Sequence, residues 1–317
     1  MLSIFISLVS SIFVARHEEK SFLSWMRNTN QYYTNDEYHF RLGIFLANSR
    51  YIREFNSVKR SFKVGLNHLS CYTPSEYKAL LGRTQFPTKS LQSIPKKING
   101  DIPDSIDWRE KNIVNEIRDQ GQCGSCWAFG TIQACESAYA LTHGILLSCS
   151  EQNLVDCCYA CGGCTGGDES QALDYILNYQ NGYLNSEDVY PYKAHQCDCT
   201  YDSSKGINKI KSYVHGIKDD EIYLQHLVAQ GVCDIGIDAS WISFHEYSSG
   251  IYDNPDCTGD SLSHAVGLVG YGAENGVEYW IVRNSWGKMW GEDGYVRMSR
   301  NKNNQCGVAT EALQVYA

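Results

Sequence analysis

A cysteine at the end of a glycine-rich turn is the side chain of this 317-residue chain that is best placed to act as a nucleophile. Cys126 closes the run Q-G-Q-C-G-S-C, residues 120–126, and a helical pattern follows over residues 127–141. In the first turn of a helix, free backbone N–H groups and the positive end of the helix dipole stabilise a thiolate. The side-chain amide of Gln120 can return to the same place. Together with the backbone N–H of Cys126, it would form an oxyanion hole.

Two downstream motifs extend the pattern around this cysteine. Residues 123–127 read C-G-S-C-W, and His264, 138 residues after Cys126, opens the run H-A-V-G-L-V-G-Y-G. Asn284 lies 20 residues further on, in the run R-N-S-W-G. With these three motifs in this order, the chain resembles the papain-like cysteine proteases, and most of all their cathepsin L-like branch.

The resemblance implies a cysteine endopeptidase that works through an acyl-enzyme. Cys126 would attack the scissile carbonyl as a thiolate paired with the imidazolium of His264. His264 would then protonate the leaving amine and activate water for deacylation. Asn284 would accept a hydrogen bond from the imidazole, with Trp286 shielding that bond, and Gln120 would stabilise the oxyanion. This chemistry needs no metal and no organic cofactor.

The resemblance also places residues along the substrate cleft. Gly166 and Gly167 match a backbone platform on which a peptide pairs like an added strand. The S2 pocket receives P2, the second residue before the scissile bond. Two acidic residues, two small ones and an acidic floor residue would line it: Asp168, Glu169, Gly236, Ala265 and Glu311. Such a pocket would accept Arg at P2 as well as hydrophobic residues. Alternatively, Asp168 and Glu311 point into solvent.

The chain departs from the family pattern in two places. Gly130 stands where relatives commonly have Ser after C-W-A-F, and we expect a packing difference there without lost activity. In the pro-region, the motif G-x-N-x-F-x-D is only partly present, because Leu69 replaces Phe and Cys71 replaces Asp. If that Asp helps to trigger processing in relatives, its absence puts the trigger in doubt here.

The fourteen cysteines indicate an oxidising route. The resemblance implies three disulfides: Cys123–Cys164, Cys157–Cys199 and Cys257–Cys306. The sequence leaves six other cysteines open as free thiols or further bridges: Cys135, Cys149, Cys158, Cys161, Cys197 and Cys233. Residues 157–164, C-C-Y-A-C-G-G-C, also suit zinc, because C-x2-C occurs there twice. However, no second C-x-x-C or paired His lies at zinc-ribbon spacing.

Three segments make up the expected chain. An apolar run too short to span a bilayer predicts a signal peptide over residues 1–15, with an N-terminal anchor as the alternative. The resemblance implies a helical inhibitory propeptide over residues 16–98, laid backwards through the cleft, and a mature peptidase domain over residues 99–317. The propeptide signature E-R-F-N-I-N falls on one helical face within residues 36–57: Glu37, Arg41, Phe45, Asn48, Ile52 and Asn56. Residues 82–101 read as a linker.

The order of the patterns predicts an α+β fold. Helical spacing is expected at residues 127–141, 150–157, 169–180 and 219–230, and strands at 232–238, 263–272, 277–284 and 293–298. The resemblance implies a papain-like fold with a helical left domain, an antiparallel β-barrel-like right domain and a cleft between them. Cys126 would lie on one wall and His264 on the other.

Charge divides the chain. Residues 16–99 carry a net charge of +8 and residues 100–317 carry −17. Attraction between two such parts would weaken as carboxylates become protonated, which is a hypothesis for acid-triggered activation. The chain lacks a nucleic-acid-like basic patch, and 43% apolar with 20% charged residues indicates a globular protein.

We therefore expect a monomer of the secretory pathway, in a lysosome-like compartment or outside the cell. Its expected partners are protein and peptide substrates, its own propeptide as an intramolecular inhibitor and cystatin-like inhibitors, without nucleic acid or stable membrane insertion. The alternative function is a catalytically silent protein that keeps the fold and captures peptides. The complete set of Cys126, His264, Asn284 and Gln120 argues against it.

Overall fold

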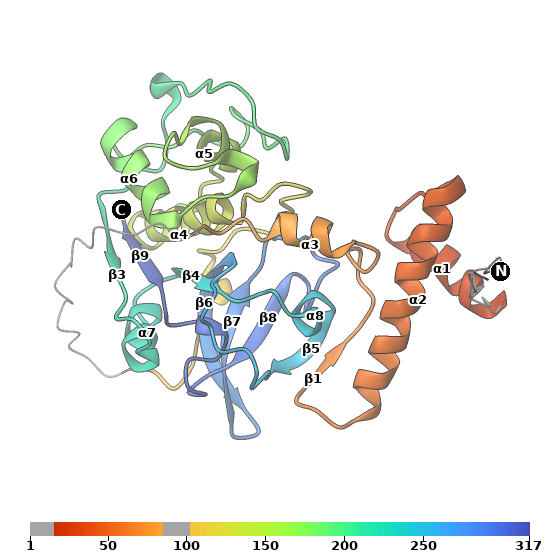
Figure 1. Cartoon of the computed structure of the whole chain (residues 1–317). Helices are drawn as coiled ribbons and strands as arrows, with labels where there is room; N and C mark the ends of the chain where they lie inside the picture. Colours follow the sequence, from red (N-terminus) through yellow and green to blue (C-terminus); the bar gives the residue numbers. More distant parts are fainter. Residues whose placement is uncertain (1–15, 85–101) are drawn as a thin grey trace, which may run out of the picture.

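The computed structural model describes residues 16–84 and 102–317, and in these ranges helices and strands form separate layers (Figure 1). The arrangement is the α+β fold that the sequence predicts. The predicted signal peptide, most of the predicted linker and the predicted processing region lie outside the described residues. No helix in the two described ranges is both long and apolar enough to cross a membrane.

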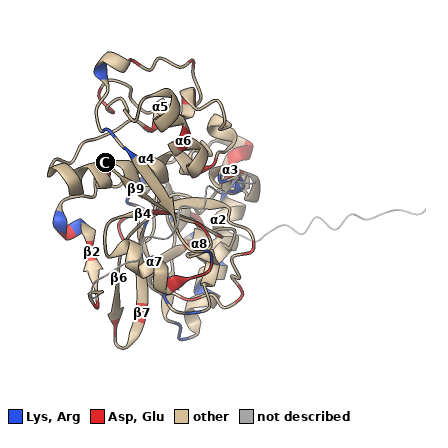
Figure 2. Ribbon diagram, turned by 90° about the vertical axis from the view of Figure 1, so that its left-hand side faces the viewer, with Lys and Arg blue, Asp and Glu red and all other residues tan. Residues whose placement is uncertain are grey.

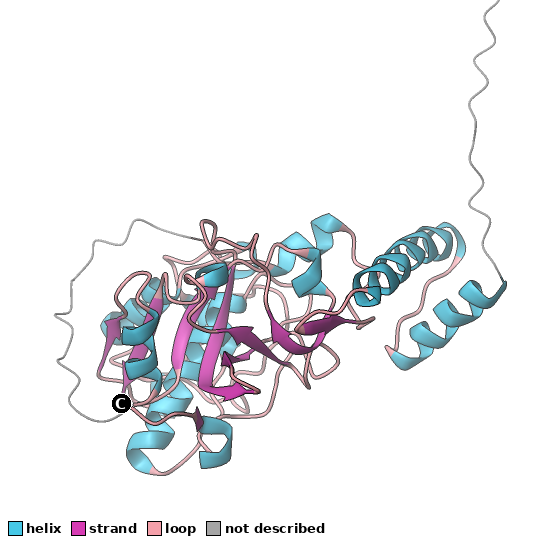
Figure 3. Ribbon diagram, turned by 90° about the horizontal axis from the view of Figure 1, so that it is seen from below, coloured by secondary structure: helices cyan, strands magenta, loops and turns pink. Residues whose placement is uncertain are grey.

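Residues 16–84 form a largely helical arm, whose first part lies beside the main body (Figures 1 and 3). Its elements are α1 (Arg16–Asn28), α2 (Asn35–Ser57), β1 (Phe62–Val64) and α3 (Pro74–Leu80). The two long helices share a small aromatic core in which the rings of Phe22, Trp25 and Phe45 lie within 6 Å of one another. The two long helices therefore have a core of their own, whereas β1 and α3 pack into the core of the sheet layer through Phe62, Val64, Tyr77 and Leu80.

The residues of the propeptide signature lie on the face of α2 that contacts the later part of the arm. Asn48 Nδ2 donates to Ser70 O over 2.7 Å. The guanidinium of Arg41 binds both carboxylate oxygens of Glu76, in the first turn of α3, each over 2.6 Å. The periodicity seen in the sequence thus reflects one row of side chains that fastens the later half of the arm to α2.

The helical layer of the peptidase domain is built around α4 (Cys126–His143), with α5 (Glu151–Cys157) and α6 (Glu169–Tyr179) beside it (Figure 1). Most of α4 is buried, because it lies between the other two helices and the sheet. Ser150 caps α5, since its hydroxyl accepts a hydrogen bond from Asn153 N over 2.9 Å.

The sheet layer lies on the other side of α4. Its described strands and short helices are β2 (Ile106–Asp107), β3 (Ser212–His215), α7 (Glu221–Val228), β4 (Cys233–Ile237), α8 (Ile242–His245), β5 (Tyr247–Tyr252), β6 (His264–Glu274), β7 (Val277–Arg283), β8 (Tyr295–Ser299) and β9 (Ala312–Tyr316). The strand order is β1-β5-β8-β7-β6-β4-β9-β3, with β2 paired to β6. All of these pairs are antiparallel except β5 with β8. The propeptide strand β1 extends the sheet of the domain that it covers.

The structure contains the three disulfides that the resemblance implies, and a fourth one between Cys158 and Cys161. All four cysteines of the run 157–164 are therefore bonded to sulfur, which leaves no thiolate there for zinc. Besides Cys126, five described cysteines are free thiols: Cys71, Cys135, Cys149, Cys197 and Cys233. Acidic residues are spread over both layers of the peptidase domain (Figure 2).

Candidate active site

Cys126 is the first residue of α4, where the helical layer meets the sheet. The turn before it is held by the Cys123–Cys164 disulfide and by a hydrogen bond from Gly124 N to Cys164 O, 2.9 Å. The thiol is completely buried, and the backbone N–H of Ala265, in β6, donates to its sulfur. The sequence thus delivers the thiol to a helix N-terminus, as expected.

His264 and Asn284 meet at one end of the sheet. His264 begins β6 and Asn284 follows the last residue of β7, its antiparallel neighbour. His264 Nε2 lies 2.7 Å from Asn284 Oδ1, and an amide oxygen can only accept, so Nε2 carries a proton. Nδ1 is buried and makes no hydrogen bond with any described residue. The ring of Trp286 lies 4.6 Å from the imidazole and covers it.

Gln120 is fully buried, and its amide is held at both ends. Its Nε2 donates to Leu80 O, in the propeptide, over 2.9 Å and to Cys123 O over 2.8 Å. Its Oε1 accepts a hydrogen bond from Ser285 Oγ over 2.7 Å. The amide N–H groups therefore point to where a carbonyl oxygen from another segment can bind. Sequence reasoning missed Ser285, although it stands in the same N-S-W-G run as Asn284.

Propeptide residues 82–84 lie across the site. Gly167 N donates to Gly82 O, and Thr84 N donates to Gly167 O, each over 2.9 Å, so that Arg83 and Gly167 form a parallel bridge. Gly82 approaches so closely that a Cβ there would lie 1.9 Å from Gly124 O. The backbone of Gly167 thus acts as a pairing platform, and a glycine in the propeptide makes the close contact possible.

Burial under this segment changes the protonation of both reactive side chains. It raises the pKa of Cys126 to about 12, against smaller opposite effects of the backbone N–H groups of Ala265 and Gly82. Burial lowers the pKa of His264 to about 4, and the hydrogen bond that His264 donates to Asn284 opposes this shift. In the covered site the sulfur therefore keeps its proton and the imidazole stays neutral.

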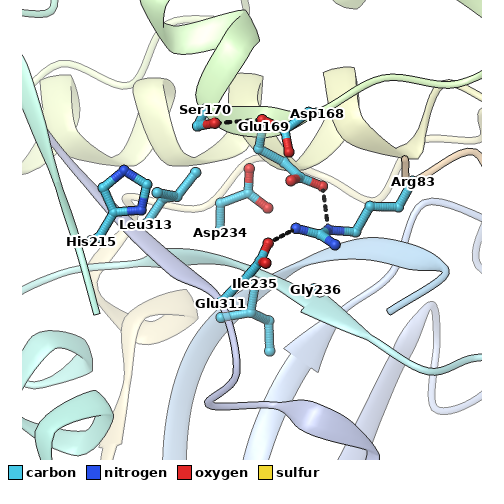
Figure 4. Close-up of a pocket in the computed structure, with 10 residues that line it drawn as sticks. All are labelled: Arg83, Asp168, Glu169, Ser170, His215, Asp234, Ile235, Gly236, Glu311 and Leu313. Atoms are coloured by element: carbon cyan, nitrogen blue, oxygen red, sulfur yellow. Dashed lines mark hydrogen bonds and ion pairs between the residues drawn. The ribbon is translucent and has the colours of Figure 1, made fainter. Parts of the chain in front are cut away.

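The side chain of Arg83 fills an acidic pocket (Figure 4). Its Nε lies 3.0 Å from Glu169 Oε1, and a terminal guanidinium nitrogen bonds Glu311. Burial raises the pKa of Glu169 to about 7, and the positive charge of Arg83 opposes this rise. Neither Arg83 nor Asp234, another acidic residue of the pocket, was identified from the sequence.

The structure gathers most of the pocket residues that the resemblance implied. Asp168 lines the pocket and also caps α6 by accepting a hydrogen bond from Gln171 N over 3.0 Å. Gly236 makes room for the guanidinium, since a Cβ there would lie 2.7 Å from Arg83 Nε. Ala265 contacts the thiol of Cys126 instead of lining the described cavity, and Trp286 lies against the imidazole of His264, outside that cavity.

Comparisons with known proteins agree with this geometry. Residues 102–316 match the papain family of cysteine proteases, and residues 22–77 match the cathepsin propeptide inhibitor domain. The chain belongs to the papain family. It is a cysteine-type peptidase made with an N-terminal inhibitory propeptide.

Individual relatives cover nearly the whole chain. Cysteine proteinase 5 of Dictyostelium discoideum is 36% identical over 98% of each chain, and digestive cysteine proteinase 2 of Homarus americanus is 40% identical over 89% of this chain and 90% of its own. Among solved structures, digestive procathepsin L2 from the larval midgut of Tenebrio molitor superposes with a TM-score of 0.88 at 35% identity. That comparison covers 95% of this chain and all of the other. The papain-family zymogen is therefore similar to cathepsin L-like precursors along its full described length.

Proposed function

We propose that this papain-family zymogen is an endopeptidase whose catalytic set is Cys126, His264, Asn284 and Gln120. The observation that carries the proposal is the way the propeptide occupies the site. A propeptide carbonyl accepts the amide N–H of Gln120, the propeptide backbone pairs with Gly167, and a side chain enters the acidic pocket. A peptide substrate would need the same three contacts.

Removal of residues 82–84 uncovers the thiol and starts the chemistry. Without burial, the proton of Cys126 moves to His264 Nδ1, because the helix N-terminus stabilises the thiolate and Asn284 holds the opposite nitrogen. The thiolate attacks the scissile carbonyl, and the oxyanion is stabilised by Gln120 Nε2 and the backbone N–H of Cys126. His264 then protonates the amine, which leaves. Water, deprotonated by His264, attacks the thioester and releases Cys126 as the thiolate.

We further propose that the S2 pocket accepts Arg as well as hydrophobic side chains at P2. The support is that Arg83 is already bound there between Glu169 and Glu311. The same reading assigns residues 1–15 to a signal peptide, 16–98 to the propeptide and 99–317 to the mature enzyme. We propose that the enzyme is a monomer in a lysosome-like compartment or the extracellular space, and that cystatin-like proteins inhibit it.

Hydrolysis of a Phe-Arg reporter tests the proposed activity. The purified precursor is assayed at neutral pH and after acidification, with Cys126→Ser as the control. We expect activity to appear only after acidification, together with loss of the propeptide, and a thiol-directed epoxide to label Cys126 only in the processed form. No hydrolysis and no labelling by a folded, processed sample would reject the enzyme and favour the peptide-binding alternative.

A further inference from the structure

The pocket that holds Arg83 contains one carboxylate whose position depends on an unusual glycine. Asp234 lies in β4, in which every residue is buried, and its side chain points at α4. A Cβ at Gly130, in α4, would lie 2.3 Å from Asp234 Oδ1 and 2.9 Å from its Cγ. The absence of a side chain at Gly130 is what admits this carboxylate.

Asp234 has no other partner that explains its burial. Asp234 is only 1% exposed, and neither of its carboxylate oxygens accepts a hydrogen bond from a described residue. The hydroxyl of Thr131 lies nearby, but it donates its single proton to Trp127 O over 2.8 Å. A buried carboxylate without a partner is costly, and a cation is the group that offsets this cost best.

The surroundings of Asp234 are arranged for a guanidinium. The carboxylate lies between Arg83 on one side and Leu313 and His215 on the other (Figure 4). Arg83 uses two of its nitrogens on Glu169 and Glu311, while its third, NH1, is buried without a hydrogen bond to a described residue. A cavity of about 70 Å³ remains in the pocket. An unused donor on Arg83, the unused acceptors of Asp234 and free space therefore lie in the same pocket.

We propose that Asp234, admitted by Gly130, is the residue that makes this pocket select Arg at P2. This inference rests on the proposed endopeptidase function and specifies the P2 side chain that the enzyme recognises. Glu311 pairs with Arg83 directly, but its side chain is 47% exposed and water screens its charge, whereas Asp234 is buried.

The pocket prefers Arg to Lys. Glu169, Asp234 and Glu311 come from α6, β4 and the chain before β9, and so approach the cation from different directions. The planar guanidinium has five N–H donors in a fixed fork that reach several acceptors at once, whereas an ammonium is a single compact centre.

Asp234→Asn in the matured enzyme tests the proposal, since it keeps the shape and removes the charge. We measure kcat/KM on Arg-Arg, Lys-Arg and Leu-Arg reporters, with active sites counted by a thiol-directed epoxide. The ratio of Arg-Arg to Leu-Arg is expected to fall about tenfold or more, and further than in Glu311→Gln. Asp188→Asn, which removes an exposed charge outside the pocket, is the matched control and leaves the ratio unchanged. An unchanged ratio in Asp234→Asn overturns the proposal.

A second variant keeps the test decisive if Asp234→Asn does not fold. In Gly130→Ser/Asp234→Ser, the added hydroxymethyl group fills the space that the carboxylate leaves. We expect this enzyme to cleave Leu-Arg and to discriminate against Arg-Arg; retention of the parent ratio contradicts the proposal. A parent enzyme that cleaves no reporter and is not labelled at Cys126 would instead refute the endopeptidase function itself.

Discussion

At the scale of single residues, the orientation of Gln120 depends on a serine that touches no substrate. The amide oxygen of Gln120 accepts from Ser285 Oγ, which turns the amide nitrogen towards the carbonyls of Leu80 and Cys123. Both residues are buried, so solvent does not compete for the bond. Ser285 is therefore a positioning residue for the proposed oxyanion hole.

Ser285→Ala is expected to lower kcat with a smaller change in KM. Loss of one such hydrogen bond corresponds to about 1 kcal/mol, or roughly fivefold, whereas Gln120→Ala removes the donor itself and costs about 10²–10³ in kcat. If Ser285 acts through Gln120, the double variant is no slower than Gln120→Ala alone. Additive losses in this double-mutant cycle would show that Ser285 has a separate role.

At the scale of elements, α2 organises the inhibitory arm. Its buried side holds the aromatic core, while its polar row binds the carbonyl of Ser70 and the side chain of Glu76. These contacts fix the path of the chain from β1 to α3. Because α3 leads directly into residues 82–84, the position of α3 determines how these residues cover the cleft.

Asn48→Ala is expected to destabilise the arm. It leaves the carbonyl of Ser70, a fully buried residue, without this hydrogen bond, which costs about 1–3 kcal/mol. Urea unfolding of the Cys126→Ser precursor measures the change, because that precursor cannot process itself under the proposed mechanism. Asn28→Ala, at an exposed position of α1, is the control. Equal stability of the two variants would contradict the assigned role of Asn48.

At the scale of the whole molecule, the charge imbalance between the two parts acts through one buried contact. Within the described ranges, the propeptide Arg and Lys side chains that form ion pairs do so inside the arm, with the exception of Arg83. The net charges of +8 and −17 therefore give a general attraction between the two parts, and the pocket around Arg83 provides the specific attraction. A buried pair of this kind is screened only weakly by salt.

The charge of Arg83 makes the attraction dependent on pH. Burial raises the pKa values of Glu169 and Asp234, and the positive charge of Arg83 opposes both rises. The attraction between these carboxylates and Arg83 therefore weakens as the carboxylates become protonated, when the pH falls towards and below about 7, the pKa of Glu169 with Arg83 present. Burial also lowers the pKa of His215, against Glu311 and Asp168, so its protonation at still lower pH adds a repulsive charge.

Arg83→Gln is therefore expected to process itself at a higher pH than the parent precursor. The shift should be about one pH unit or more, because the variant lacks the contact that acid otherwise weakens. Reporter activity and propeptide loss are followed after incubation at a series of pH values. Lys78→Gln removes an exposed propeptide charge from α3 and serves as the control. Identical pH profiles for all three proteins would show that Arg83 does not control activation.

The sequence by itself predicted many of the local elements and the candidates for the catalytic set. Helical and alternating periodicity depends on which face of an element is buried, and the four strands predicted from residue 232 onward begin and end within two residues of β4, β6, β7 and β8, whereas β5 and β9 were not predicted. Cys126, His264, Asn284 and Gln120 are recognisable because each stands in a short run of characteristic neighbours.

Only the tertiary structure placed Arg83 and Asp234 in the acidic pocket, beside Asp168, Glu169, Gly236 and Glu311, which the family resemblance had already assigned to it. Arg83, Glu169, Asp234 and Glu311 come from four separate parts of the chain, and no local pattern links them. Asp234 stands in a strand of otherwise apolar or small residues, and at Gly130 the sequence predicts only a packing difference, with no link to Asp234 until the fold places the two in contact. Side chains are brought together by packing across the sheet and α4, and that packing is a property of the whole fold.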